Sequence, residues 1–157
     1  MNVGTRVGTE GDLRTLVELY RASREALVSE RGGRVHLLKE AFGEPLEPHF
    51  RAIVRDNQWL VLVGTLDDVP VGVAIARLDE MRDLSQLATI EVLYVDPAAR
   101  EAGVGDKLLT TAVNWAAQRG ATGVDVQVLP GMRVPKSFLE GSGFVARLLI
   151  MHRRLER

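Results

Sequence analysis

An arginine and two closely spaced glycines stand between an apolar run and a long amphipathic segment of the chain. Arg100, Gly103 and Gly105 form this group. They follow a strand expected over Leu87–Val95 and open a helix expected over Gly103–Arg119. The first backbone N–H groups of a helix lack partners within it and can bind phosphate oxygens. Glycines allow a close backbone approach, and arginine adds a charge-assisted contact. The pattern indicates a phosphate-binding loop; a glycine-packed strand-to-helix turn is the alternative.

Two familiar phosphate loops do not match this segment. A P-loop requires Gly-Lys-Ser/Thr, but Asp106-Lys107 follows the glycines here. A dinucleotide fingerprint requires a third glycine, and Leu108 stands in its place. The loop therefore needs a different context before its ligand can be named.

Glu91 is the only charged residue between Leu87 and Val95. A carboxylate in an apolar strand needs a reason, because burying an unpaired charge is costly. One hypothesis is a general base that accepts a proton from an incoming ammonium group, directly or through water. The alternative is that Glu91 faces solvent or pairs with an arginine such as Arg77 across the sheet.

Hydrophobic periodicity and turn residues predict the elements that must position these residues. Long helices are expected over about Glu10–Leu27 and over Gly103–Arg119. A third helix is expected to begin at Pro45 and Pro48 and to continue to about Asp56, and a short one is expected over Pro135–Glu140. Strands are expected over Val3–Val7, Trp59–Leu66, Val69–Leu78, Leu87–Val95, Gly123–Leu129 and Phe144–Arg154. Glu30–Arg34 is expected to be a mobile loop. The order predicts a mixed α/β sheet in a single domain.

Composition restricts the class of protein further. A chain of 157 residues is long enough for about one domain. A net charge of −1 without a basic run gives no sign of nucleic-acid or anionic-membrane partners. The absence of cysteine excludes disulfides, thiolate metal sites and a cysteine nucleophile. The three histidines show no metal-ligand spacing, so no metal is expected. No secretory signal or membrane-length apolar run occurs, so we expect a cytoplasmic protein.

The segment Leu93-Tyr94-Val95-Asp96-Pro97, followed by Arg100-x-x-Gly103-x-Gly105, resembles motif A of the GNAT N-acetyltransferases. Gly143-Phe144 near the end of the chain also matches the family pattern, and the resemblance covers nearly the whole chain. It implies a GNAT-like domain over residues 1–157, with a mixed, mostly antiparallel central sheet flanked by helices. It also implies acetyl-CoA as the acyl donor.

The resemblance assigns roles residue by residue. The backbone of Leu93, Tyr94 and Val95 would pair with the pantetheine arm like an added strand. The pyrophosphate would lie in the loop formed by Arg100, Glu101, Ala102, Gly103, Val104, Gly105 and Asp106. Glu91 would be the catalytic base. The implied reaction is direct acetyl transfer to a primary amine on a small molecule or peptide of unknown identity.

The sequence departs from the family at the position of its usual acid. Leu139 stands where many members carry a tyrosine that protonates the thiolate, and Met132 replaces an asparagine. These changes keep open a non-catalytic acyl-CoA-binding module, or a scaffold without a ligand. Strand alternation predicts that Tyr94 packs on the face opposite Glu91. A homodimer is also compatible with the apolar run Leu148–Met151, which suits an internal strand equally well.

Overall fold

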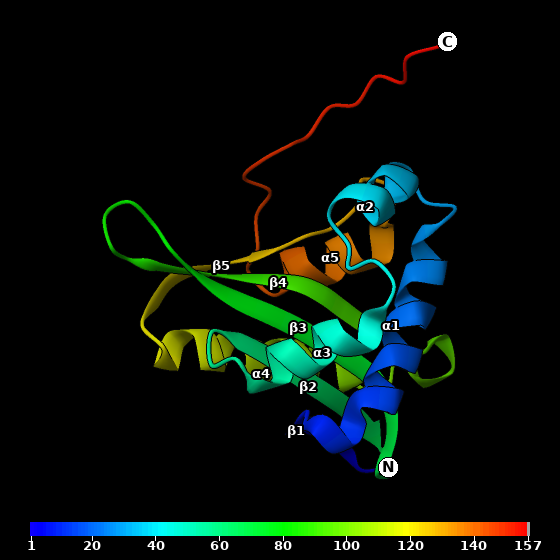
Figure 1. Ribbon diagram of the computed structural model, residues 1–157, viewed down its shortest axis with the longest axis vertical. Helices are drawn as coiled ribbons and strands as arrows, with labels where there is room; N and C mark the ends of the chain where they lie inside the picture. Colours follow the sequence, from blue (N-terminus) through cyan, green and yellow to red (C-terminus); the bar gives the residue numbers. More distant parts are fainter. Residues whose placement is uncertain (157) are drawn as a thin grey trace.

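A five-stranded mixed sheet forms the centre of the protein (Figure 1). The computed structural model describes residues 1–156. The strands follow one another across the sheet in chain order: β1 (Val3–Val7), β2 (Trp59–Leu66), β3 (Val69–Glu80), β4 (Gln86–Val95) and β5 (Ala121–Val126). Neighbours are antiparallel except β4 and β5, which are parallel. The predicted fold class is confirmed.

The central strands are apolar on both faces because helices cover both sides of the sheet. Along β2, Val61 and Val63 belong to one buried cluster, whereas Leu60 and Leu62 belong to another. Such two-sided burial explains why β2 reads as a continuous apolar run without polar alternation.

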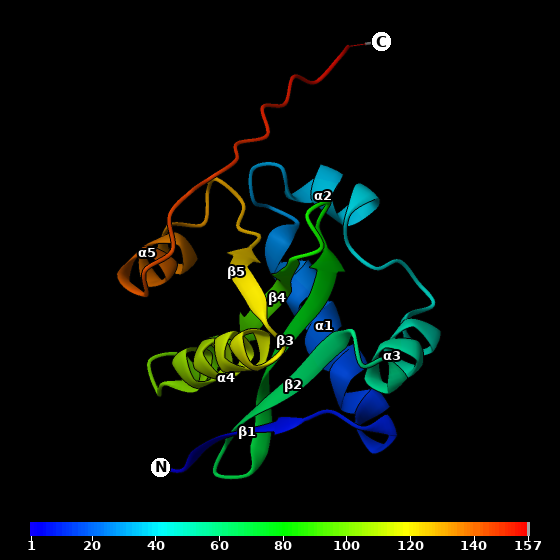
Figure 2. The same cartoon turned by 90° about the vertical axis from the view of Figure 1, so that its left-hand side faces the viewer.

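Helices α1 (Leu13–Leu27) and α3 (Leu46–Arg55) cover one face, and α4 (Val104–Gln118) covers the other (Figure 2). Helix α5 (Arg133–Gly141) contributes the buried Leu139 to the cluster on the α4 side. The first cluster includes Leu16, Tyr20 and Phe50, all almost fully buried. The sheet is therefore the middle layer of three.

Local signals place the ends of several elements. Asp67 and Asp68 have φ values of 50° and 64°, so the β2–β3 hairpin turns through two left-handed residues as a type I′ turn requires. Thr9 and Asp12 form a capping box ahead of α1. Gly120, with φ of 79°, follows α4 at its C-terminal end. Each of the three has a short-range sequence signal: an Asp-Asp pair between two β-rich runs, a threonine followed by acidic residues, and a glycine after an amphipathic segment.

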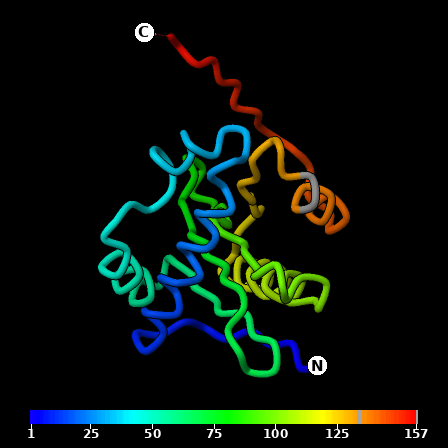
Figure 3. Tube along the Cα trace, turned by 90° about the vertical axis from the view of Figure 1, so that its right-hand side faces the viewer, coloured from blue at the N-terminus to red at the C-terminus, as the bar shows by residue number. Residues whose placement is uncertain are grey.

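Three sequence predictions need correction. Glu30–Arg34 was expected to be a loop, but helix α2 (Gly33–Lys39) begins inside it. Strand β5 starts at Ala121 and ends at Val126, three residues before the predicted end. The predicted strand Phe144–Arg154 is wrong, because residues 144–156 form neither helix nor strand. They leave the body of the protein beyond α5, and a strand requires a partner strand to satisfy its backbone (Figure 3).

Within residues 1–156, no helix combines the length and apolar character needed to cross a membrane. The same residues contain no group of three histidine or carboxylate side chains placed to hold a metal ion.

Candidate functional site

Strands β4 and β5 separate halfway along β4. Their last pair is Ile90 with Val126, followed by a hydrogen bond of 3.2 Å from the Gln127 N–H to the Ile90 carbonyl. Beyond this point β4 remains paired with β3 as far as Val95. On the β5 side, residues 91–95 have no partner strand within the part of the chain that the structure describes. Apart from the Val95 carbonyl, which accepts from Arg100 Nε, their backbone N–H and C=O groups on that edge are available to a ligand.

A β-bulge lies where the two strands separate. Ile75 pairs with Val92 and Ala76 pairs with Ile90, so Glu91 is the extra residue in β4. A bulge interrupts the alternation of side chains along a strand. Glu91 and Val92 consequently line the same small cavity, on the side of the sheet covered by α1.

The bulge also corrects the placement of Tyr94. Val92 and Tyr94 both pack against the α1-side cluster, whereas Leu93 and Val95 pack on the α4 side. Tyr94 thus shares a face with Glu91, contrary to the prediction from simple alternation. Burial, together with the nearby Asp96 carboxylate, raises the pKa of Tyr94 above its ordinary value.

Glu91 forms an ion pair with Arg77 of β3. Arg77 also donates from Nε to Asp79 Oδ2 at 2.9 Å, so one guanidinium joins two carboxylates. The pairing named as an alternative from the sequence is therefore present. The Glu91 side chain is 20% exposed.

The cavity beside Glu91 has a volume of about 20 Å³. That is enough for about one water molecule, which needs roughly 10–15 Å³. Its lining includes Tyr20, whose hydroxyl accepts a hydrogen bond of 2.8 Å from the Phe42 N–H. Burial raises the pKa of Tyr20, so the hydroxyl keeps its proton at neutral pH. His36 of α2 and Glu40, the residue after it, complete the polar part of the lining, with 3.6 Å between His36 Nδ1 and Glu40 Oε2.

The backbone of the predicted phosphate loop leads into the N-terminus of helix α4, with open space above Gly103. Gly103 lies in the left-handed region with φ of 96°, directly before the first residue of α4. An added Cβ at Gly103 would meet no atom within 4 Å, so the space above it is open. The next three amides lie in the first turn of the helix and have no helical partner. Arg100 donates from Nε to the Val95 carbonyl at 3.2 Å, which connects the loop to the end of β4.

A close contact between β2 and α4 fixes this helix on the sheet. A Cβ at Gly64 would lie 2.7 Å from Val104 Cγ1 and 3.0 Å from Leu108 Cδ1. Only glycine allows α4 to begin so near the strand, because real Cβ atoms do not approach so closely. Sequence reasoning did not identify Gly64, since an isolated glycine in a strand indicates close backbone approach without naming the partner.

Leu139, which the sequence resemblance aligns with a tyrosine of the family, is buried in the α4-side cluster. Its side chain packs among apolar residues and offers no proton. The structure therefore brings Leu93–Val95 and the Gly103 loop together at one end of α4, and it places Glu91 where β4 and β5 separate.

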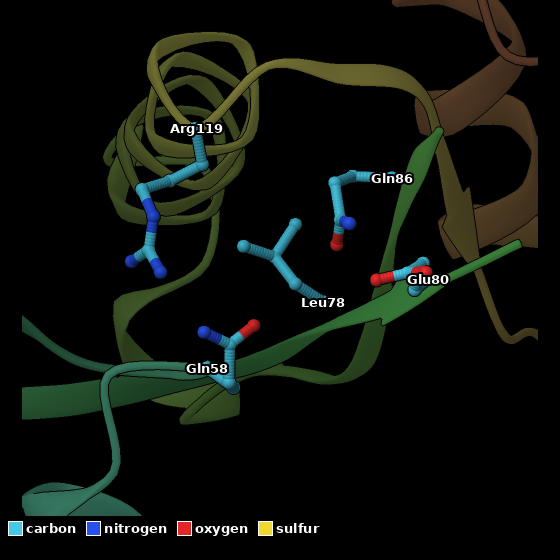
Figure 4. A pocket seen from close by; sticks show the side chains of 5 residues that line it. All are labelled: Gln58, Leu78, Glu80, Gln86 and Arg119. Carbon is cyan, nitrogen blue, oxygen red and sulfur yellow. The ribbon is translucent and has the colours of Figure 1, made fainter. Parts of the chain in front are cut away.

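A larger open hollow of about 470 Å³ lies near the opposite end of α4 (Figure 4). Gln58, Glu80, Gln86 and Arg119 supply its polar lining. Arg119 is the C-cap of α4, whereas the Gly103 loop is its N-cap. Fifteen helical residues separate them, about 22 Å along the axis. This hollow is thus separate from the phosphate loop.

Comparison with known proteins identifies relatives of this arrangement. The model of the Acetyltransferase (GNAT) family matches residues 16–139. No curated protein matches the sequence significantly. Among solved structures, the chain is similar to an aminoglycoside acetyltransferase from an uncultured soil metagenomic sample, in complex with sisomicin. The two share 22% sequence identity with a TM-score of 0.73, and the match covers 99% of this chain and 96% of the other.

Two further structures show the same fold. A transcriptional regulator from Bacillus halodurans C-125 shares 26% identity, with a TM-score of 0.72 over 97% of this chain and 100% of the other. AAC(6')-Iy, in complex with the bisubstrate analog CoA-S-monomethyl-acetylneamine, shares 18% identity, with a TM-score of 0.71 over 99% and 100% of the two chains.

Proposed function

Because the chain belongs to the GNAT family of acetyltransferases, we propose that it transfers an acetyl group from acetyl-CoA to a primary amine. The observation that carries this proposal is the separation of β4 from β5 after Ile90 and Val126. It leaves the backbone edge of residues 91–95 open beside a helix N-terminus.

The open edge and the glycine loop fit the two parts of the donor. An extended pantetheine arm can hydrogen-bond as an added strand would, through those backbone groups of Leu93, Tyr94 and Val95 that face the open edge, where the Val95 carbonyl already accepts from Arg100 Nε. A pyrophosphate fits the space above Gly103, where no atom lies within 4 Å of a Cβ position. The amides of Val104, Gly105 and Asp106 and the positive end of α4 favour the negative charge there.

Acetyl-CoA supplies an activated thioester, whose carbonyl carbon accepts the amine nitrogen and whose thiolate then leaves. The chain has no cysteine to carry an acyl group, which favours direct transfer. The protein must then provide a neutral amine. An alkyl ammonium with a pKa near 10.4 costs about 4.6 kcal/mol to deprotonate at pH 7.

Glu91 is the proposed proton acceptor, acting through a water in the adjoining cavity. Its carboxylate borders a space of about one water molecule and pairs with Arg77. A positioned base of this kind contributes about 10²–10⁴-fold to a rate.

The leaving group makes a smaller demand on the protein. A thiol with a pKa near 8.5 leaves as thiolate at pH 7 for about 2 kcal/mol relative to the protonated thiol. Water can supply that proton, so a buried Leu139 at the usual acid position is compatible with turnover.

A small-molecule amine is the acceptor class we propose. The relatives bound to sisomicin and to an acetylneamine analog support this choice. Two carboxylates, Glu40 and Glu91, line the small cavity beside the open part of β4. They favour a cationic ligand.

The test measures thiol release from acetyl-CoA with a panel of primary amines, including aminoglycosides, polyamines, amino acids and peptides. Glu91→Gln should reduce kcat by at least about tenfold while changing acetyl-CoA affinity little. Asp79→Asn is the matched control, because it removes the other carboxylate bound to Arg77. Equal kcat in both variants across pH would show that Glu91 only pairs with Arg77.

A further inference from the structure

The hydroxyl of Tyr20 is a buried hydrogen-bond donor beside the small cavity that Glu91 lines. Tyr20 lies on α1, is 3% exposed and belongs to the lining of that cavity. Its oxygen accepts the hydrogen bond of 2.8 Å from the Phe42 N–H. Among the groups that the structure describes, none accepts the phenolic proton in return. Buried polar groups are normally satisfied, so this proton calls for an acceptor inside the cavity.

Aromatic contacts hold the Tyr20 ring in place. Its centroid lies 5.5 Å from that of Phe42, with the rings stacked, and 5.4 Å from that of Phe50, with the rings edge to face. Both distances are typical of favourable aromatic pairs. Because burial raises the pKa of the Tyr20 phenol, the hydroxyl also keeps its proton at neutral pH. The fold therefore provides a donor at a fixed position.

The cavity joins Tyr20 to Glu91 without direct contact between them. Both residues line it, but the Tyr20 hydroxyl bonds to Phe42 and forms no hydrogen bond with Glu91. The volume of about 20 Å³ suits one water molecule, and a buried water typically makes about three hydrogen bonds. Tyr20 can donate one and Glu91 can accept one. Gln127, also in the lining, has an amide side chain that can supply a third.

We propose that Tyr20 is a positioning residue, which donates its phenolic proton to a water molecule in this cavity and holds that water between the acceptor amine and Glu91. The inference rests on the proposed function, because it adds a residue to the same proton transfer. One lone pair of the water accepts from Tyr20, which leaves the other for the ammonium N–H.

The proton transfer balances without any further reactant. The ammonium group gives one proton to the water as the water gives one to the Glu91 carboxylate. A neutral amine and a neutral carboxylic acid result, and the water is unchanged. Tyr20 keeps its own proton throughout, so its part is to orient the water and not to exchange protons with it.

The substitution Tyr20→Phe tests this role because it removes the hydroxyl and keeps the aromatic ring. In the thiol-release assay, kcat should fall about 3–10-fold, the equivalent of one net hydrogen bond, while KM for acetyl-CoA changes little. Ser23→Ala is the matched control. The Ser23 hydroxyl is also buried on α1 and donates to the Tyr20 carbonyl at 2.7 Å, but it lies outside the cavity lining. An equal fall in kcat in both variants would overturn the proposal.

A double-mutant cycle separates positioning from a structural role. If the hydroxyl acts through a water shared with Glu91, Tyr20→Phe combined with Glu91→Gln should be no slower than Glu91→Gln alone. If the hydroxyl only supports the Phe42 N–H, the two losses should multiply, and the proposal is wrong. An unchanged kcat in Glu91→Gln alone would instead refute the proposed base, and this inference with it.

Crystal structures of the wild type and of Tyr20→Phe test the water independently of turnover. The wild type should show an ordered water within hydrogen-bond distance of both Tyr20 Oη and the Glu91 carboxylate. In Tyr20→Phe that water should be displaced or lost. A wild-type cavity without this water, or a water at the same place in both structures, would overturn the proposal whatever the activity of the two proteins.

Discussion

Gly103 is the residue whose replacement separates cofactor binding from folding most clearly. Its φ of 96° is a conformation that costs an L-residue about 1–2 kcal/mol. No atom lies within 4 Å of an added Cβ, so Gly103→Leu should cost only that strain. For a domain of this size the loss corresponds to a fall in Tm of about 2–8 °C. In the proposed site, however, the leucine would fill the space meant for pyrophosphate.

Gly120 provides the matched control at the other end of α4. Its φ is 79°, and an added Cβ there also meets no atom within 4 Å. Gly120→Leu should therefore lower Tm by a similar amount. Calorimetric titration should show acetyl-CoA affinity at least about 10-fold weaker in Gly103→Leu, the equivalent of one charge-assisted hydrogen bond, and nearly unchanged in Gly120→Leu. Equal affinities in the two variants would refute the phosphate-loop assignment.

Two further predictions concern stability. In urea unfolding, Gly64→Ala should destabilise the fold by about 1–3 kcal/mol, because the new Cβ would lie 2.7 Å from Val104 Cγ1. Gly43→Ala is the control: its Cβ would meet no atom within 4 Å, so it should change the unfolding free energy little. Asp12→Ala should cost about 0.5–2 kcal/mol at pH 7, because it removes a capping box and the hydrogen bond from Arg6. The hydrogen bond from the Arg6 guanidinium lowers the pKa of Asp12 in the folded state. The contribution of Asp12 to stability is therefore complete above its unfolded pKa near 3.9 and is lost as pH falls through its folded pKa. A gap between wild type and Asp12→Ala that is as large at low pH as at pH 7 would contradict this cause.

Much of the fold was predictable because local sequence and global structure agree. The Asp67-Asp68 turn, the Thr9 cap and the Gly120 stop are short-range signals with one physical reading each. The order of helices and strands around the central sheet followed from their periodicity. Gly103 drew attention because glycine adopts backbone conformations that other residues avoid, and it does have a φ of 96°.

The errors arose where distant residues decide the outcome. The bulge at Glu91 depends on pairing with β3, so alternation along β4 alone placed Tyr94 on the wrong face. The segment Phe144–Arg154 was predicted as a strand, but a strand also needs a partner strand to satisfy its backbone. Helix α2 lacks a cap signal at its start, where Gly32 adopts a left-handed conformation.

Thermal unfolding with and without acetyl-CoA tests the central claim most directly. At a free concentration of 100 times Kd, a ligand that binds only the native state adds about 2.7 kcal/mol to its stability. For this domain we predict a rise in Tm of roughly 5–10 °C with acetyl-CoA and no rise with NAD. An unchanged Tm at millimolar acetyl-CoA would contradict the donor site at β4 and the Gly103 loop.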